Sequence, residues 1–407
     1  MKKNILIIIP TLSGGGAEKV AANLSKVLSK KYNLYLIIFQ NEITYDYSGK
    51  IINLGLMGKN NFFSKLSVFL KRIIKLKKIK KKYNIDLSIS FLDSGNIVNI
   101  ISKYKDKTIL SIRNFKSKEN NGVYSKIYAF MIKKLFNKAN KIVSISDLAK
   151  EALINNFNIK RDKVITIYNP YDLDDIDNKQ KEKIENEYKK IFEKPTIITA
   201  GRLHYQKAHW SLIKSFYIAK KDIKNLQLVI LGKGDLEKDL KKLCKDLNLE
   251  NSVHFLGYQI NPYKYIKNAD IFVLSSLYEG FPNALVEAMS CGKPVISTDC
   301  PSGPREILAP DTDIFKKSKN IEYAKYGILI PELINKMSFD PDDINEKEII
   351  MANAIKKLIT DKSLSEKYSK LGKERVKDFE IFKISQKWID LIDKELTDYS
   401  NFVPNHI

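Results

Sequence analysis

The stretch IFVLSSLYEGFPNALVEAMSCGKPVIST, residues 271–298, contains the pattern of a strand, a turn and a helix in direct succession. Residues 271–276 form a short apolar run, which predicts a buried parallel strand. Turn-forming residues follow at 279–283, and residues 284–289 are strong helix formers. Because α/β proteins bind ligands at the carboxyl ends of parallel strands, this turn is a candidate ligand site.

Two glutamates mark the turn and the helix. Glu279 lies on the turn and Glu287 lies eight residues later. The new helix would offer unpaired backbone N–H groups and the positive end of its dipole to phosphate or sugar oxygens. Either glutamate alone also fits an ordinary solvated acid near a helix start. Together, residues 279–287 resemble the donor-binding E-x7-E segment of retaining glycosyltransferase family 4, whose turn positions are here Gly280, Phe281, Pro282 and Asn283.

That resemblance implies the GT-B fold, in which two Rossmann-like α/β domains face each other across a cleft. Residues 1–170 would form an acceptor-binding domain, 171–194 a linker and 195–379 a nucleotide-sugar-binding domain, with residues 380–407 returning to the first domain as a terminal helix. The amphipathic pattern of residues 378–396 by itself shows only a packed helix. By the resemblance, Glu279 would orient the donor sugar and Glu287 the ribose.

Two further motifs agree with this resemblance. The segment GRLHYQK, residues 201–207, follows an apolar strand pattern, and Arg202 and Lys207 would bind one dianion. It resembles the diphosphate clamp of the family. Near the amino terminus, Gly15 and Gly16 match the glycines of the family's G-G-A-E loop, although three consecutive glycines also fit a structural turn. Neither segment is a dinucleotide fingerprint or a P-loop.

The first half of the chain alternates between strand and helix patterns, which predicts a parallel sheet. Arg113 and Asn114 end one of these strands, where many members of the family carry a histidine on the acceptor side of the cleft. Arg113 would suit an anionic or pyrophosphate-bearing acceptor, and a surface salt bridge is the alternative. Two D-x-D motifs lie at residues 172–177, but they occur in a charged linker, so we expect no metal site and no cofactor.

Composition narrows the class of protein further. Three scattered cysteines predict no disulfide framework or metal cluster, which fits a reducing compartment. No apolar run is long enough to span a membrane, so we expect a cytoplasmic protein. The net charge of +23 fits nucleic acid, an anionic membrane or codon bias. Residues 59–141, however, hold 21 Lys and Arg against 4 Asp and Glu, a local net of +17 that codon bias does not explain.

The most basic part of that region is residues 59–82, which hold ten basic residues and no acid. Their apolar residues recur at nearly helical spacing, so a surface helix packed on the sheet is one interpretation. A cationic amphipathic helix with exposed Phe and Leu is also what an anionic membrane surface attracts. We therefore predict a protein peripheral to the inner face of the cell membrane.

The motifs together predict a retaining, metal-independent glycosyltransferase. Its donor would be a UDP-linked hexose or N-acetylhexosamine, and its acceptor a bacterial surface glycan, such as capsule or lipopolysaccharide, carried on polyprenyl diphosphate. A sugar-nucleotide epimerase on a similar scaffold is the alternative enzyme. A nucleic-acid-binding protein explains the basic region but none of the motifs after residue 195, so we expect no nucleic acid partner. The sequence names neither donor nor acceptor, and it gives no role to the irregular, charged residues 309–350.

Overall fold

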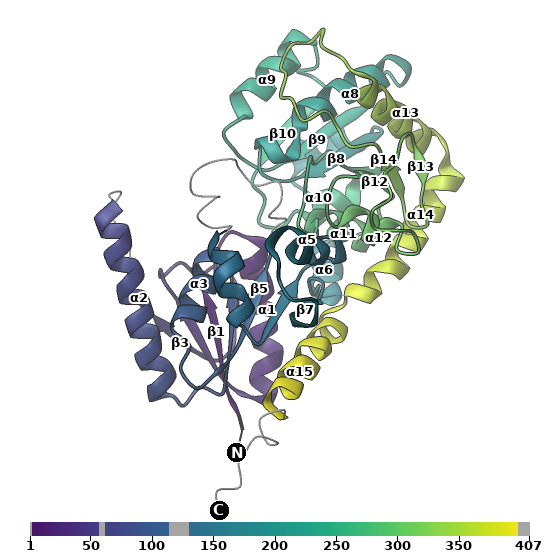
Figure 1. Ribbon diagram of the computed structural model, residues 1–407. Coiled ribbons are helices and arrows are strands. Elements are labelled where there is room, and N and C mark those ends of the chain that lie inside the picture. The colour runs from purple at the N-terminus through teal and green to yellow at the C-terminus, as the bar shows by residue number, and fades with distance from the viewer. Residues whose placement is uncertain (1, 57–61, 114–129, 398–407) are drawn as a thin grey trace, which may run out of the picture. The chain divides into compact units, whose positions relative to one another are not determined.

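The computed structural model describes residues 2–56, 62–113 and 130–397. The chain divides into two compact units (Figure 1): unit 1 contains residues 1–171 and 379–407, and unit 2 contains residues 172–378. Residues 172–194, which we expected to be a linker, include the helices α6 (Leu173–Lys179) and α7 (Lys189–Phe192) and group with unit 2.

Unit 1 is built on a seven-stranded sheet in which every neighbouring pair is parallel, in the order β3-β2-β1-β4-β5-β6-β7. Its strands are β1 (Asn4–Ile9), β2 (Asn33–Ile38), β3 (Lys50–Asn53), β4 (Leu87–Phe91), β5 (Lys107–Ile112), β6 (Lys141–Ser144) and β7 (Val164–Thr166). Its helices include α1 (Gly16–Lys31), α2 (Phe62–Lys82), α3 (Asp93–Ile101), α5 (Asp147–Phe157) and α15 (Ile381–Thr397), with short 3-10 turns at Phe136–Lys138, Arg161–Lys163 and Lys377–Phe379.

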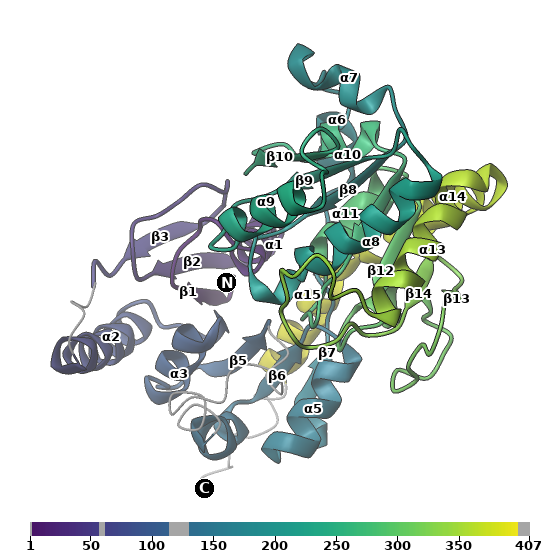
Figure 2. The same cartoon turned by 90° about the horizontal axis from the view of Figure 1, so that it is seen from above.

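Strand β1 shows why the strands of this sheet are nearly continuous apolar runs: helices cover both faces of the sheet. Ile5, Ile7 and Ile9 pack with α1 and α15, whereas Leu6 and Ile8 pack with α2 and α3. Figure 2 shows α2 and α3 on one side of this sheet. Successive side chains of a strand point to opposite faces, so each helix layer is served by alternate residues.

The last helix, α15, belongs to unit 1, which confirms the returning helix expected for the GT-B fold. Ile384, Trp388 and Ile392 are completely buried in the same apolar cluster as α1. The chain enters the helix through a pair of backbone hydrogen bonds, from Tyr171 N to Phe379 O (2.9 Å) and from Ile381 N to Tyr171 O (2.8 Å). Most of the amphipathic pattern is therefore used in packing, and Phe382 is exposed.

Unit 2 repeats the architecture with the order β10-β9-β8-β11-β12-β14-β13, parallel except for the β13–β14 pair. Its strands are β8 (Thr196–Ala200), β9 (Gln227–Leu231), β10 (Val253–Gly257), β11 (Ile271–Leu274), β12 (Val295–Thr298), β13 (Glu322–Tyr323) and β14 (Ile328–Ile330). Its other helices are α8 (His209–Asp222), α9 (Glu237–Asp246), α10 (Tyr263–Asn268), α11 (Asn283–Ser290), α12 (Pro304–Leu308), α13 (Glu346–Thr360) and α14 (Lys362–Val376), with 3-10 turns at Asn186–Tyr188 and Tyr205–Lys207.

The segment expected to be irregular, residues 309–350, is mostly so up to residue 345, but residues 346–350 begin α13. Residues 309–345 also contain one buried strand that the sequence did not reveal. All three residues of β14 are completely buried, and the strand pairs with β12 in the interior of the sheet. A run of three apolar residues is too short to show a period. The segment therefore contributes to the core of unit 2 as well as to its surface.

In each sheet the order of the strands reverses at one point, between β1 and β4 in unit 1 and between β8 and β11 in unit 2. At such a point the connections leave two neighbouring strands toward opposite faces, which opens a crevice at their carboxyl ends. The loops after β8 and β11 are the two that carry the motifs at 201–207 and 279–287. The topology therefore brings these two motifs together.

Candidate active site

The turn between β11 and α11 is fixed by its own side chains and by the next loop. Leu277 and Phe281 are each 5% exposed, and Glu279 is 6% exposed. The backbone N–H of Glu279 donates to Pro301 O at 3.0 Å. The glutamate is thus not a solvated acid, because burial holds it in a single environment.

Glu279 forms an ion pair with Lys207 across the point where the sheet order reverses. Lys207 Nζ lies 2.5 Å from Glu279 Oε1, and Ser276 Oγ donates to the same oxygen at 2.6 Å. Gln206 Nε2 reaches Oε2 at 3.4 Å. Three donors from two loops therefore hold this carboxylate in place, and the lysine expected in the diphosphate clamp is already paired with the glutamate expected to orient the sugar.

Arg202 lies on the same loop as Lys207, but its side chain is exposed and makes no hydrogen bond or ion pair within the described residues. The structure therefore does not bring Arg202 and Lys207 onto one common group. The turn after β9 packs closely against this loop, so that a Cβ on Gly232 would lie 1.9 Å from Gly201 O. Only glycine permits that approach, and the resulting contact is sealed by a hydrogen bond from Leu203 N to Lys233 O (3.0 Å).

Glu287 lies on α11, where Tyr263 Oη donates to its Oε1 at 3.2 Å. It is half-buried, and the carboxylate is oriented by the first residue of α10. Phe281 and Pro282 are buried, whereas Gly280 and Asn283 are half-buried around the amino end of α11. Within the five-residue turn 279–283, only Gly280 and Asn283 are partly exposed to solvent.

In unit 1, Gly15 is the N-cap of α1 and Gly16 is its first residue, directly after the carboxyl end of β1. The left-handed backbone of this loop is at Gly14, with φ of +79°. Glu18, the last residue of the G-G-A-E motif, lies in the first turn of α1. Burial raises the pKa of its carboxyl group above the ordinary value. A carboxylate near a helix amino end is normally favourable, so Glu18 fits a structural role at the start of α1.

Arg113 is buried, with 8% exposure, so the alternative of a surface salt bridge is wrong. Its Nη1 donates to Asn169 Oδ1 at 2.6 Å, and its guanidinium carbon lies 5.0 Å from the ring centre of Phe91 and 6.0 Å from that of Trp388. Nε and Nη2 have no hydrogen-bond partner among the described residues. Burial lowers the pKa of Arg113 to about 9. Asn114, expected beside it, lies outside the described residues.

The acidic motifs at 172–177 are used in local structure. Asp172 caps α6 by accepting from Asp175 N at 2.9 Å, and Asp177 pairs with Lys181 at 2.5 Å. In the parts of the chain that the structure describes, no group of three or more His, Cys, Asp or Glu is arranged to hold a metal ion.

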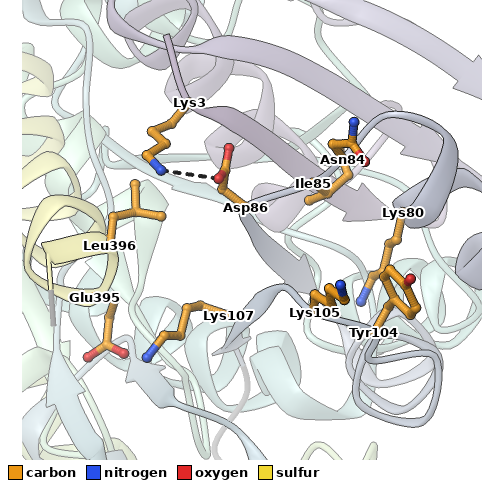
Figure 3. Close-up of a pocket in the computed structure, with 10 residues that line it drawn as sticks. All are labelled: Lys3, Lys80, Asn84, Ile85, Asp86, Tyr104, Lys105, Lys107, Glu395 and Leu396. Atoms are coloured by element: carbon orange, nitrogen blue, oxygen red, sulfur yellow. Dashed lines mark hydrogen bonds and ion pairs between the residues drawn. The ribbon is translucent and has the colours of Figure 1, made fainter. Parts of the chain in front are cut away.

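A cavity of about 240 Å³ opens at the amino-terminal edge of the unit 1 sheet (Figure 3). Lys3 and Asp86 form an ion pair at one side of it (3.3 Å), and Glu395 and Lys107 lie at another. It contains none of the predicted site residues, because Gly15, Gly16 and Arg113 follow the carboxyl ends of β1 and β5. The cavity is therefore separate from the candidate active site.

Comparison with known proteins assigns both halves of the chain. Residues 14–175 match the family described as Glycosyltransferase Family 4, and residues 180–375 match Glycosyl transferases group 1. An uncharacterized glycosyltransferase of Methanocaldococcus jannaschii is 38% identical over 340 residues, 80% of this chain and 83% of the relative.

A second relative is characterised. The N-acetylgalactosamine-N,N'-diacetylbacillosaminyl-diphospho-undecaprenol 4-alpha-N-acetylgalactosaminyltransferase of Campylobacter jejuni is 32% identical over 388 residues, 93% of this chain and 96% of the relative. Among solved structures, Anabaena HepE in complex with UDP and glucose shares the fold with a TM-score of 0.73 and 16% identity, covering 96% of this chain and 100% of that one.

Proposed function

Since the chain belongs to the family 4 glycosyltransferases of the GT-B fold, we propose that it transfers a sugar from a UDP-linked donor to a polyprenyl-diphosphate-linked glycan. Transfer proceeds with retention of the anomeric configuration and without a metal ion bound by the protein. The observation that supports this proposal most is the buried Lys207–Glu279 pair at the reversal point of the unit 2 sheet.

The pair is arranged for an exchange of partners. Lys207 is neutralised by Glu279. When the donor diphosphate arrives, the ammonium group turns to a phosphate oxygen, and the exposed Arg202 adds a second, bidentate donor. The charge that builds up on the leaving diphosphate is then stabilised by these two cations, which replace a metal ion electrostatically.

Glu279 is retained in place through this exchange by Ser276, which donates to the same carboxylate oxygen. Its freed acceptor capacity then orients a hydroxyl of the donor sugar. Glu287, oriented by Tyr263, accepts from the ribose hydroxyls. Gly15 and Gly16, in the glycine loop before α1, leave the backbone of that loop open to close approach by a ligand. We assign no nucleophile.

The donor sugar is proposed from the relatives. The Campylobacter jejuni relative is named as an N-acetylgalactosaminyltransferase that acts on an undecaprenol-linked diphosphate, and the Anabaena structure contains UDP. We therefore propose a UDP-N-acetylhexosamine as the donor in preference to a UDP-hexose.

The acceptor diphosphate is assigned to Arg113. Two of its nitrogens, Nε and Nη2, lack partners among the described residues, and an unsatisfied buried cation is costly. An anionic group of the acceptor would satisfy them. Replacing Arg113 by Gln should therefore weaken use of a diphosphate-linked acceptor while donor hydrolysis continues. If acceptor use is unchanged, Arg113 is only a structural link between β5 and α15.

We propose that α2 binds the membrane that carries the acceptor. Phe63, Leu66, Leu70 and Ile74 are exposed at spacings of three and four residues, and Phe63 is 81% exposed. Of the nine basic residues in α2, Arg72 and Lys75 hydrogen-bond to loop carbonyls and Lys80 is buried against Asp106 at 2.8 Å. The remaining lysines are exposed: Lys65, Lys71, Lys77, Lys78, Lys81 and Lys82. An apolar stripe beside exposed cations suits an anionic lipid surface.

Within the described residues no helix is both long and apolar enough to cross a bilayer.

The test of the whole proposal is to incubate the protein with a panel of UDP-sugars and an undecaprenyl-diphosphate-linked saccharide. A radiolabelled sugar should move into the lipid fraction from a UDP-N-acetylhexosamine. No transfer from any donor in the panel would overturn the proposal.

A further inference from the structure

The Lys207–Glu279 pair is one of several links between its two loops, which also meet through hydrogen bonds from Leu277 N to Gln206 O (2.8 Å) and from Gln206 Nε2 to Tyr278 O (2.8 Å). Residues 309–345 contact the supports of both loops. On the Glu279 side, the supporting loop is 299–305, which consists of the connection after β12 and the first two residues of α12. It touches the donor turn in three ways: Glu279 N donates to Pro301 O (3.0 Å), Ser302 Oγ donates to Gly280 O (2.7 Å), and a Cβ on Gly303 would lie 2.4 Å from Pro282 Cδ.

This supporting loop is kinked and needs to be held. Ser302 has φ of +71° and Gly303 has φ of +97°, so two successive residues are in or near the left-handed region. Such a backbone persists only where the surroundings determine it. The ends of the loop are joined by a buried ion pair, in which Arg305 Nη2 lies 2.5 Å from Asp299 Oδ2.

The first part of 309–345 completes that ion pair. Glu322 accepts from Arg305 Nη2 at 2.9 Å and from Nη1 at 3.2 Å. Ser318 links the two carboxylates, because its backbone N–H donates to Asp299 Oδ2 (2.7 Å) and its hydroxyl to Glu322 Oε2 (2.8 Å). Arg305 is thus clamped between Asp299 and Glu322, and the kinked loop cannot shift without breaking this network.

The second part of 309–345 contacts the Lys207 side. Tyr205, in the 3-10 turn that ends at Lys207, donates its hydroxyl to Asn335 O (3.1 Å) and Oδ1 (2.8 Å). Its ring lies 5.6 Å from that of Trp210, and Trp210 in turn meets Phe339 at 6.2 Å. The turn that carries Lys207 is therefore linked to residues 309–345 through Tyr205 and Trp210.

We propose that residues 309–345 act as a brace that holds the Lys207–Glu279 pair from both sides, through Glu322 and Arg305 on one and through Asn335 and Tyr205 on the other. Glu322 and Tyr205 are positioning residues, since neither is placed at the donor. In the proposed function, Lys207 moves from Glu279 to the diphosphate when the donor binds. A rigid brace keeps the two loops that carry Lys207 and Glu279 in position during this exchange. This inference rests on the proposed function for its catalytic consequence, but its structural content does not.

The first test needs no substrate. Hydrogen exchange is measured on peptides covering 277–289 and 203–211 in the intact protein. Glu322→Gln should raise exchange by about threefold or more in the first peptide, and Tyr205→Phe should do so in the second. Asp311→Asn is the matched control, because Asp311 pairs with Lys325 in the same segment (2.8 Å) with both side chains exposed. Unchanged exchange in both variants, or equal changes in the control, would overturn the brace.

The second test measures turnover of UDP-N-acetylgalactosamine and the Kd for UDP. Each brace variant should lose about tenfold in kcat, with KM and the UDP Kd within about threefold, because a misplaced group affects the transition state more than ground-state binding. Glu279→Gln is the benchmark. If Glu279→Gln loses turnover and both brace variants keep it, the brace is refuted. If the wild type turns over no UDP-sugar, the proposed function fails, and the exchange result still decides the brace.

Discussion

The replacement of Lys207 and Arg202 by alanine separates their expected roles. Arg202 is exposed and makes no ion pair in the described part of the chain, so Arg202→Ala should change the free energy of unfolding by less than about 0.5 kcal/mol. At the transition state, however, loss of one fixed charge costs about 3 kcal/mol, which is about a hundredfold in turnover. We expect a stable protein with little activity.

Lys207→Ala should cost activity and stability together. It leaves Glu279 buried with only Ser276 and Gln206 as side-chain donors, a loss of about 1–2 kcal/mol. In a unit of this size each kcal/mol lowers Tm by about 2–4 °C, so a fall of about 2–8 °C is expected. The double variant Lys207→Ala, Glu279→Gln should recover part of that stability without recovering activity.

The assay is UDP release from UDP-N-acetylgalactosamine with the lipid-linked acceptor, beside thermal unfolding of each variant. Lys241→Ala provides the matched control, because Lys241 pairs with Glu237 at 2.6 Å on an exposed helix surface of the same unit. The control should keep full turnover. Turnover within about threefold of wild type for both Arg202→Ala and Lys207→Ala would refute the diphosphate clamp.

Three further outcomes are expected. Turnover should survive excess EDTA, and complete loss restored by manganese or magnesium would contradict metal independence. Replacing the exposed Lys77, Lys78, Lys81 and Lys82 by Gln should weaken binding to anionic vesicles by up to about 4 kcal/mol at low salt and by less at high salt, while donor hydrolysis is kept; a wild type that ignores such vesicles would refute membrane docking. The hydrogen bond from Arg305 lowers the pKa of Glu322 to about 2, so its stabilisation is complete above the ordinary value of 4.5 and is lost as pH falls toward 2. In urea unfolding, the free energy of unfolding of Glu322→Gln should therefore fall less than that of the wild type as the pH drops from 4.5 to about 2. Equal falls in the two proteins would contradict the ion pair.

The sheets of both units could be predicted largely from apolar runs, because strands covered on both faces need apolar residues at every position. The apolar runs at residues 4–9 and 87–91, for example, form β1 and β4. The misses have physical causes. β14 is too short to show a period, and β10 interrupts its apolar run with His254, which bonds to Gln227 at 2.9 Å.

The contacts between the candidate site residues could not be predicted from the sequence. The motifs pointed to Lys207 and Glu279 separately, whereas their pairing depends on β8 and β11 being neighbours, a property of the sheet order. For Arg113 an acceptor-binding role and a surface salt bridge were both left open, because the sequence does not show that the ring of Trp388, from the far end of the chain, lies 6.0 Å from its guanidinium. Lys80 looked like one more exposed cation, although its spacing of four from the buried Leu76 places both on one helix face.

The central claim is most directly tested by following the anomeric configuration of the product. The protein is incubated with UDP-N-acetylgalactosamine and an undecaprenyl-diphosphate-linked saccharide, and the lipid product is examined by proton NMR. We predict transfer to the lipid-linked acceptor with the new linkage in the α configuration of the donor. A β linkage would contradict retention, and conversion of the UDP-sugar to its epimer without any transfer would contradict the glycosyltransferase mechanism itself.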